Sequence, residues 1–130
     1  MPVEQLNGFY VGYFAAAGGE GIALFCIRNA TIAGADAGGF GYDGTITQQK
    51  NGDDYDVAAS VKIPPNSASI VGVSSGQHGL AYNVNFKLPQ DLAATPFVRI
   101  DTPYGPVNMR LVKLRDLPSE VAAAGGRNRS

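Results

Sequence analysis

The chain has 130 residues, of which 45% are apolar, 17 are glycine and only 16% are charged. This length gives one domain that can bury its own apolar core, and the composition is typical of short strands joined by tight turns. The 10 basic and 11 acidic residues nearly balance, so we expect no direct nucleic-acid partner.

The N-terminal segment predicts neither export nor a membrane anchor. Residues 1–10, MPVEQLNGFY, lack a basic region followed by an apolar run, and no segment approaches the roughly 20 apolar residues of a membrane span. We therefore expect a cytoplasmic protein with no membrane span. The single cysteine, Cys26, has no internal disulfide partner and is predicted to be a small buried side chain. We expect a barrel domain over residues 1–117 and a flexible C-terminal tail over residues 118–130.

The first part of the chain predicts a series of short strands. Residues 8–14, GFYVGYF, form the first, and a loop of alanines and glycines is expected to run from there to Gly21. The stretch 21–44 then predicts a strand, a reversal at residues 28–30, a second strand ending at residues 34–36, and a glycine corner. The strand over residues 22–28 is apolar on both faces, so we expect it to be covered on both sides. Asp36 stands where its carboxylate can bond the backbone of the corner.

The second part gives the clearest alternation of apolar and polar residues. A strand over residues 40–49 leads to Asn51-Gly52, a strong hairpin signal, and Tyr55–Ile63 returns from it. Leu80–Leu88 has one apolar and one wet face. Residues 66–79 are ambiguous, because residues 69–73 fit one short strand whereas the rest is a polar loop. The remaining predicted elements are a turn or single helical turn at residues 89–93, a hairpin of strands 97–102 and 107–114, and a helical turn at 119–124.

About eight short strands without a core helix favour an all-β fold, a small antiparallel β-barrel, over a sandwich. An eight-stranded barrel can enclose one small apolar ligand. We therefore predict that the apolar face of Leu80–Leu88 lines a ligand site in the barrel interior. Its residues are Leu80, Tyr82, Val84 and Phe86. An interior packed solid by these side chains would exclude such a site.

No catalytic, metal or cofactor site is predicted. The run GVSSG at residues 72–76 fits the pattern of a nucleophile elbow, and His78 is close to it. A nucleophile elbow needs a strand-to-helix turn on a parallel sheet, which the surrounding sequence does not provide. His78 is the only histidine, so a histidine-based metal site would have to be completed by carboxylates. We expect a solvated loop here and a protein that is not an enzyme.

An acidic group follows the Asn-Gly hairpin. It consists of Asp53, Asp54 and Asp56. A charged hairpin tip is commonly just solvated, and the spacing lacks the alternating ligands of a calcium loop. The functional alternative is a docking patch for a basic protein partner.

Four segments, in this order, resemble the type III secretion negative regulator family, GrlR and its relatives. That family has a glycine-aromatic strand, a glycine-led second strand, a Gly-x-Asp corner and an aromatic-x-Gly entry. The corresponding segments here are NGFYV at residues 7–11, GEGIAL at 19–24, IAGAD at 32–36 and YDG at 42–44. The motif match covers about the first 60 residues.

The resemblance implies a lipocalin-like or calycin-like β-barrel that forms a homodimer and can hold a lipophilic molecule. It also implies a founding member that sequesters a transcriptional activator through an exposed run of four acidic residues. Here Tyr55 breaks that run, so only Asp53, Asp54 and Asp56 carry over. We expect a non-enzymatic regulatory domain that dimerises and binds a regulatory protein. The alternative is a binding module for a lipid or other apolar small molecule. The outer faces of strands 9–14 and 22–28 are the candidate dimer interface.

Overall fold

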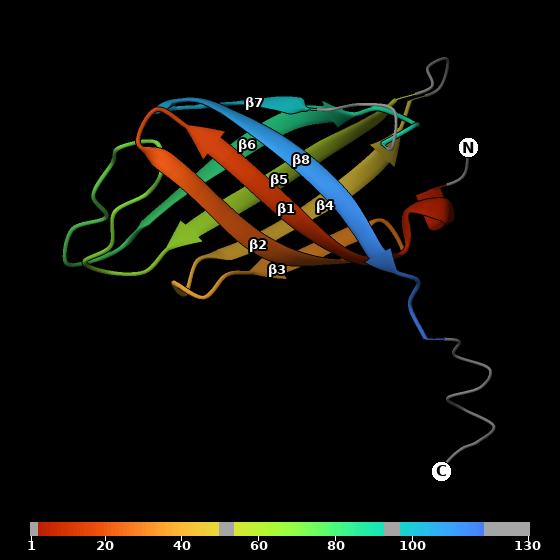
Figure 1. Cartoon of the computed structure of the whole chain (residues 1–130), viewed down its shortest axis with the longest axis horizontal. Coiled ribbons are helices and arrows are strands. Elements are labelled where there is room, and N and C mark those ends of the chain that lie inside the picture. Colours follow the sequence, from red (N-terminus) through yellow and green to blue (C-terminus); the bar gives the residue numbers. More distant parts are fainter. Residues whose placement is uncertain (1–2, 50–53, 93–96, 119–130) are drawn as a thin grey trace, which may run out of the picture.

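A computed structural model describes residues 3–49, 54–92 and 97–118 of the chain, and it is an all-β barrel (Figure 1). Eight antiparallel strands follow a single turn of 3-10 helix, η1. Their bounds are η1 Val3–Leu6, β1 Gly8–Ala16, β2 Gly19–Arg28, β3 Thr31–Ala35, β4 Gly41–Gln48, β5 Tyr55–Ile63, β6 Leu80–Leu88, β7 Val98–Thr102 and β8 Gly105–Arg115.

The strands form one sheet with the order β6-β5-β4-β3-β2-β1-β8-β7. The sheet curls so that β6 and β7, at the two ends of this order, lie against each other and bring the barrel close to closure. The rings of Tyr82 on β6 and Tyr104 in the β7–β8 turn meet edge to face across this seam, with centroids 5.4 Å apart. The structure therefore confirms the predicted small, calycin-like antiparallel barrel.

Alternation located two strands correctly. Tyr55–Ile63 and Leu80–Leu88 have the predicted bounds, and both carry an apolar inner and a polar outer row. The predicted reversal at residues 28–30 is also confirmed, because β2 ends at Arg28 and β3 begins at Thr31. Asn29 and Ala30 between them have positive φ angles of 51° and 66°, as a two-residue hairpin turn requires.

The β1–β2 hairpin is longer than predicted. We expected a loop from the alanines to Gly21, whereas β1 continues to Ala16 and β2 already begins at Gly19. The ladder runs to the Ala16–Gly19 pair, so the turn has only two residues. Backbone pairing with the partner strand has overridden the weak strand propensity of alanine and glycine here.

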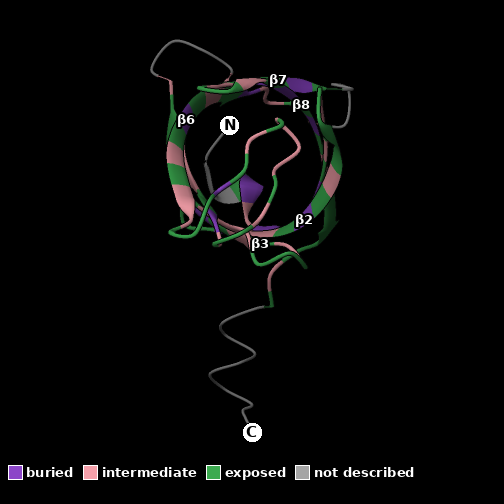
Figure 2. Ribbon diagram, turned by 90° about the vertical axis from the view of Figure 1, so that its left-hand side faces the viewer, coloured by how far each residue is buried: buried purple, intermediate pink, exposed green. Residues whose placement is uncertain are grey.

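Residues 66–79 form a loop throughout, and the short strand that residues 69–73 fitted is not formed. The loop holds one isolated bridge, between Ala68 and Ser74, and it runs from β5 to β6 across one end of the barrel (Figure 2). That open end also carries the β1–β2 turn, the β3–β4 corner and the β7–β8 turn. The described residues of the 89–93 segment, 89–92, contain no helical turn.

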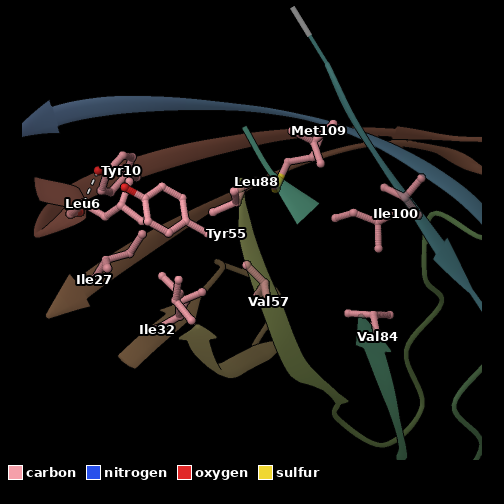
Figure 3. Close-up of a cluster of buried hydrophobic side chains, with 13 residues drawn as sticks. Leu6, Tyr10, Ile27, Ile32, Tyr55, Val57, Val84, Leu88, Ile100 and Met109 are labelled. Atoms are coloured by element: carbon pink, nitrogen blue, oxygen red, sulfur yellow. Dashed lines mark hydrogen bonds between the residues drawn. The ribbon is translucent and has the colours of Figure 1, made fainter. Parts of the chain in front are cut away.

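The opposite end of the barrel is closed by packed side chains. η1 lies across it, and the hydroxyl of Tyr10 donates a 2.7 Å hydrogen bond to the backbone carbonyl of Leu6 (Figure 3). Tyr55, Ile27 and Leu88 are each only 1% exposed. This plug was not predicted from the sequence.

Some predictions fall outside the described residues. These are the Asn51-Gly52 turn, the helical turn at residues 119–124 and most of the tail at 118–130.

Candidate functional site

The open half of the barrel contains a cavity of about 360 Å³. Residues from all eight strands, the β3–β4 corner and the β5–β6 loop line it. Most of them are apolar or aromatic: Phe14, Phe25, Ile27, Ile32, Phe40, Tyr42, Ala59, Val61, Ile70, Val71, Tyr82, Val84, Phe86, Leu88, Ile100, Val107, Met109 and Leu111. Small or hydroxyl-bearing residues also line it: Gly21, Ala37, Gly38, Ala68, Ser69 and Thr102. The remaining lining residues are Glu20, Ile22, Asp36 and Asp43. The barrel is thus packed at one end and hollow toward the other.

Three of the four residues predicted for a ligand site line this cavity. Tyr82, Val84 and Phe86 face inward from β6, whereas Leu80 is not among the lining residues. Leu80 pairs with Ile63 in the last register position of the β5–β6 ladder, at the edge of the barrel. Figure 3 shows Val84 on β6 and Ile100 on β7 pointing toward each other from neighbouring strands.

A cluster of aromatic rings forms the wall on β1, β2 and β4. The centroid of Phe25 lies 6.0 Å from that of Phe14 and 5.3 Å from that of Tyr42, and the rings of Phe14 and Tyr42 are nearly parallel. Gly34 on β3 faces the ring of Phe25, and a Cβ there would collide with the ring. Phe14 and Phe25 were not predicted as site residues, although the alternation of β1 and β2 could have assigned both to the inner face.

Asp36 joins this wall to the β3–β4 corner. Its Oδ1 accepts hydrogen bonds from the backbone N–H groups of Gly38 and Phe40, at 2.9 and 3.1 Å, which confirms the predicted cap of the corner. Its Oδ2 accepts a 3.1 Å hydrogen bond from the phenol of Tyr42. Burial and the neighbouring Asp36 charge raise the pKa of Tyr42, so the phenol stays protonated as a donor.

The β5–β6 loop is fastened to the β1–β2 turn at the mouth. The backbone N–H of Gly18 donates a 2.6 Å hydrogen bond to the carbonyl of Ile70. Inside the loop, the hydroxyl of Ser75 donates to the carbonyl of Pro64 at 2.6 Å and accepts from the N–H of Ser67 at 2.9 Å. Ser75 is only 8% exposed, so this serine braces the loop.

The GVSSG run therefore has a structural explanation. It lies in this loop, whereas the nucleophile elbow is a strand-to-helix turn. We predicted a solvated loop here, but Ser75 in this loop is buried. His78 is exposed, and its ring Nε2 lies 3.1 Å from the side-chain nitrogen of Gln77. Among the described residues, no group of three or more His, Cys, Asp or Glu side chains could hold a metal ion.

The acidic group is only partly described. Asp53 lies outside the described residues, Asp54 is half-buried at the start of β5, and Asp56 is exposed. Oδ1 of Asp56 accepts hydrogen bonds from Nζ of Lys87 at 3.4 Å and Nε2 of Gln49 at 3.1 Å. The negative charge of Asp56 is therefore partly compensated by Lys87 on the neighbouring strand β6.

A continuous apolar surface covers the outside of β1, β2 and the end of β8. Ile22 and Leu24 are each 60% exposed, so this chain does not cover the outer side of β2 as we expected. Cys26 lies half-buried on the same outer face rather than in the core. The other members are Phe9 and Tyr13 of β1, Val11 between them, which is buried, and Val112 and Leu114 of β8. We call this set the outer apolar face.

No described helix is both long and apolar enough to cross a membrane. Comparison with known proteins adds no relative, since no protein-family model matches the chain and no curated protein matches its sequence.

Proposed function

We propose that this domain is a binding module for an apolar small molecule, which enters the barrel at the open end. The observation that carries the proposal is the cavity of about 360 Å³ beside a well-packed closed end. Its volume falls in the range of small-molecule sites, and its walls are chiefly aliphatic and aromatic, as in such sites. Binding would remove this apolar surface and that of the ligand from water. The proposal includes no catalytic step.

Native mass spectrometry of the purified protein tests this function. We expect a defined additional mass that is lost when the protein is denatured, or uptake of one molecule of N-phenyl-1-naphthylamine, a neutral apolar probe. A spectrum that shows only the bare protein mass before and after incubation with the probe would contradict the proposal.

We also propose a second function, a non-enzymatic regulator that forms a homodimer and binds a regulatory protein, as the family resemblance implies. The outer apolar face supports the homodimer. Leu24 and Ile22 expose most of their side chains next to Val11, whereas the outer positions of β5 and β6 are polar, for example Ser60 and Asn83. An exposed apolar patch of this kind is typical of a protein interface.

Substitution on the outer apolar face tests the homodimer. Leu24→Glu should raise the dimer dissociation constant by about tenfold or more, because it places a charge in the centre of the face. Asn83→Glu, on the outer side of β6, is the matched control and should leave association unchanged. Sedimentation of both variants and the wild type gives the result. A wild-type monomer, or a dimer unaffected by Leu24→Glu, would contradict this use of the face.

A further inference from the structure

The charged groups around the cavity all have the same sign. Among the described residues that line it, Glu20, Asp36 and Asp43 carry charges and all three are acidic. Asp43 is exposed and alternates with the inward-facing Tyr42, and Glu20 is exposed at the β1–β2 turn. Asp36 is half-buried and bonded to an inward-facing phenol. Asp36 is therefore the carboxylate best placed to meet a bound molecule.

Asp36 retains capacity for a further hydrogen bond. An ionised carboxylate offers about four acceptor positions. Two are used at Oδ1 by the N–H groups of Gly38 and Phe40, and one at Oδ2 by the phenol of Tyr42. These three donors are neutral, so none of them compensates the negative charge of Asp36.

Ser69 is the second polar group, and it points independently to a ligand. Its Oγ is buried and has no hydrogen-bond partner in the part of the chain that the structure describes, and Ser69 lines the cavity. The backbone around it is satisfied, because the N–H of Ser69 donates to the carbonyl of Val73 at 2.9 Å. A buried hydroxyl without a partner is costly and uncommon. The Oγ is shielded from the cavity in this rotamer, so the side chain has to turn about its Cα–Cβ bond for a polar group on a bound molecule to supply the missing partner.

The aromatic wall adds a preference for positive charge. Phe14, Phe25 and Tyr42 lie with ring centroids 5.3 to 6.1 Å apart and border the same cavity as Asp36. The faces of aromatic rings carry partial negative charge and attract cations. The wall, the carboxylate and the absence of basic side chains from the described lining would all disfavour an anionic head group.

We propose that the cavity selects an apolar molecule whose polar end is a protonated amine, which bonds Asp36 and Ser69 at the open end while its hydrocarbon part fills the interior. Ligands with a carboxylate head, such as fatty acids, are selected against. This inference rests on the proposed small-molecule binding.

Three ligands with the same ten-carbon chain test the selectivity. Decylamine, decan-1-ol and decanoate compete at pH 7 with N-phenyl-1-naphthylamine for the protein, the two ionic ligands below their micelle concentrations and decan-1-ol below its solubility limit. Aliphatic amines are protonated and carboxylates ionised at this pH. A charge-assisted hydrogen bond contributes enough for a difference of about tenfold or more. We therefore expect decylamine to displace the probe at concentrations at least about tenfold lower than decanoate, with decan-1-ol between them.

Two matched variants assign the selectivity to Asp36. Asp36→Asn keeps an oxygen that can cap Gly38 and Phe40 but removes the charge, so the advantage of decylamine over decan-1-ol should disappear. Asp101→Asn removes an exposed carboxylate of β7 that does not line the cavity, and it should leave that advantage intact. Ser69→Ala should weaken decylamine and decan-1-ol alike.

The possible outcomes separate the inference from the function on which it rests. If the probe binds but the three ligands compete equally, or decanoate competes best, the amine selectivity is wrong and the binding function stands. The same conclusion follows if Asp36→Asn retains the full preference for decylamine. If the wild-type protein binds neither the probe nor any of the three ligands, both the function and the inference are wrong.

Discussion

The phenol of Tyr42 donates a 3.1 Å hydrogen bond to Oδ2 of Asp36, and this contact ties β4 to the corner that follows β3. The same carboxylate organises the corner through the N–H groups of Gly38 and Phe40. One acidic side chain thereby fixes both the shape of the β3–β4 corner and the position of an aromatic ring in the cavity wall. The geometry of the candidate site depends on this pair.

Removing the phenol should destabilise the fold modestly. Tyr42→Phe keeps the ring and its packing but leaves Oδ2 of Asp36 with one bond fewer. We expect the free energy of unfolding to fall by about 1.5–3 kcal/mol, the usual contribution of a hydrogen bond to a charged group. Urea denaturation measures it. Tyr13→Phe, at an exposed phenol on the outside of β1, is the control and should change stability little. Equal stability of Tyr42→Phe and wild type would show that the bond contributes nothing.

The contact between Gly18 and the β5–β6 loop should control exchange of a ligand. A Cβ at Gly18 would lie 2.5 Å from the carbonyl oxygen of Ile70 and 2.9 Å from the backbone nitrogen of Gly72, so Gly18→Ala forces the loop away. We expect N-phenyl-1-naphthylamine to dissociate several-fold faster in a stopped-flow displacement experiment. Gly41→Ala, where a Cβ meets no heavy atom within 4 Å, is the matched control at the same end. Identical dissociation rates for both variants would mean that the loop does not gate the cavity.

Alkaline pH should destabilise the protein through its buried phenols. Burial, together with the charge of Asp116, raises the pKa of Tyr10 to about 12. Burial raises the pKa of Tyr82 as well. An unfolded tyrosine ionises near pH 10, so above that pH the unfolded chain loses protons that the folded chain keeps. These phenols should leave the free energy of unfolding unchanged below about pH 10 and should lower it between pH 10 and 12.

Urea midpoints measured from pH 8 to pH 12 test this linkage. The Tyr10→Phe variant should show a shallower decline than the wild type, because one buried phenol has been removed. A midpoint that stays level to pH 12, with all the tyrosines ionising together near pH 10 in ultraviolet absorbance, would contradict the assignment.

Strong alternation is the reason that parts of this fold could be predicted from sequence. In Leu80–Leu88 every second residue is apolar, and that period of two matches the strand geometry with no competing signal. The cap at Asp36 was predictable for a different reason, because an aspartate before glycines bonds its local backbone in a recognisable way. Both features depend only on residues that are close together in the sequence.

The cavity itself depends on distances across the barrel, which a sequence pattern does not contain. Alternation places Val84 and Ile100 on inner faces, but it cannot tell whether inner side chains meet or leave space. The plug at the closed end was missed because it depends on one hydrogen bond, from Tyr10 to Leu6, between a strand and a segment with no periodic pattern. The position of Ile70 across the mouth likewise follows from a backbone contact with Gly18 in another hairpin.

The central claim is that the interior of the barrel binds an apolar molecule, and filling the cavity tests it most directly. Ala59 faces the cavity from β5, whereas its neighbour Ala58 faces outward and is exposed. Fluorescence titration with N-phenyl-1-naphthylamine should show saturable binding to the wild type and to Ala58→Phe. Binding to Ala59→Phe should be at least about tenfold weaker, a loss of about 1.4 kcal/mol. Circular dichroism establishes that each variant is folded. Undiminished binding to a folded Ala59→Phe, or no binding to the wild type, would contradict the claim.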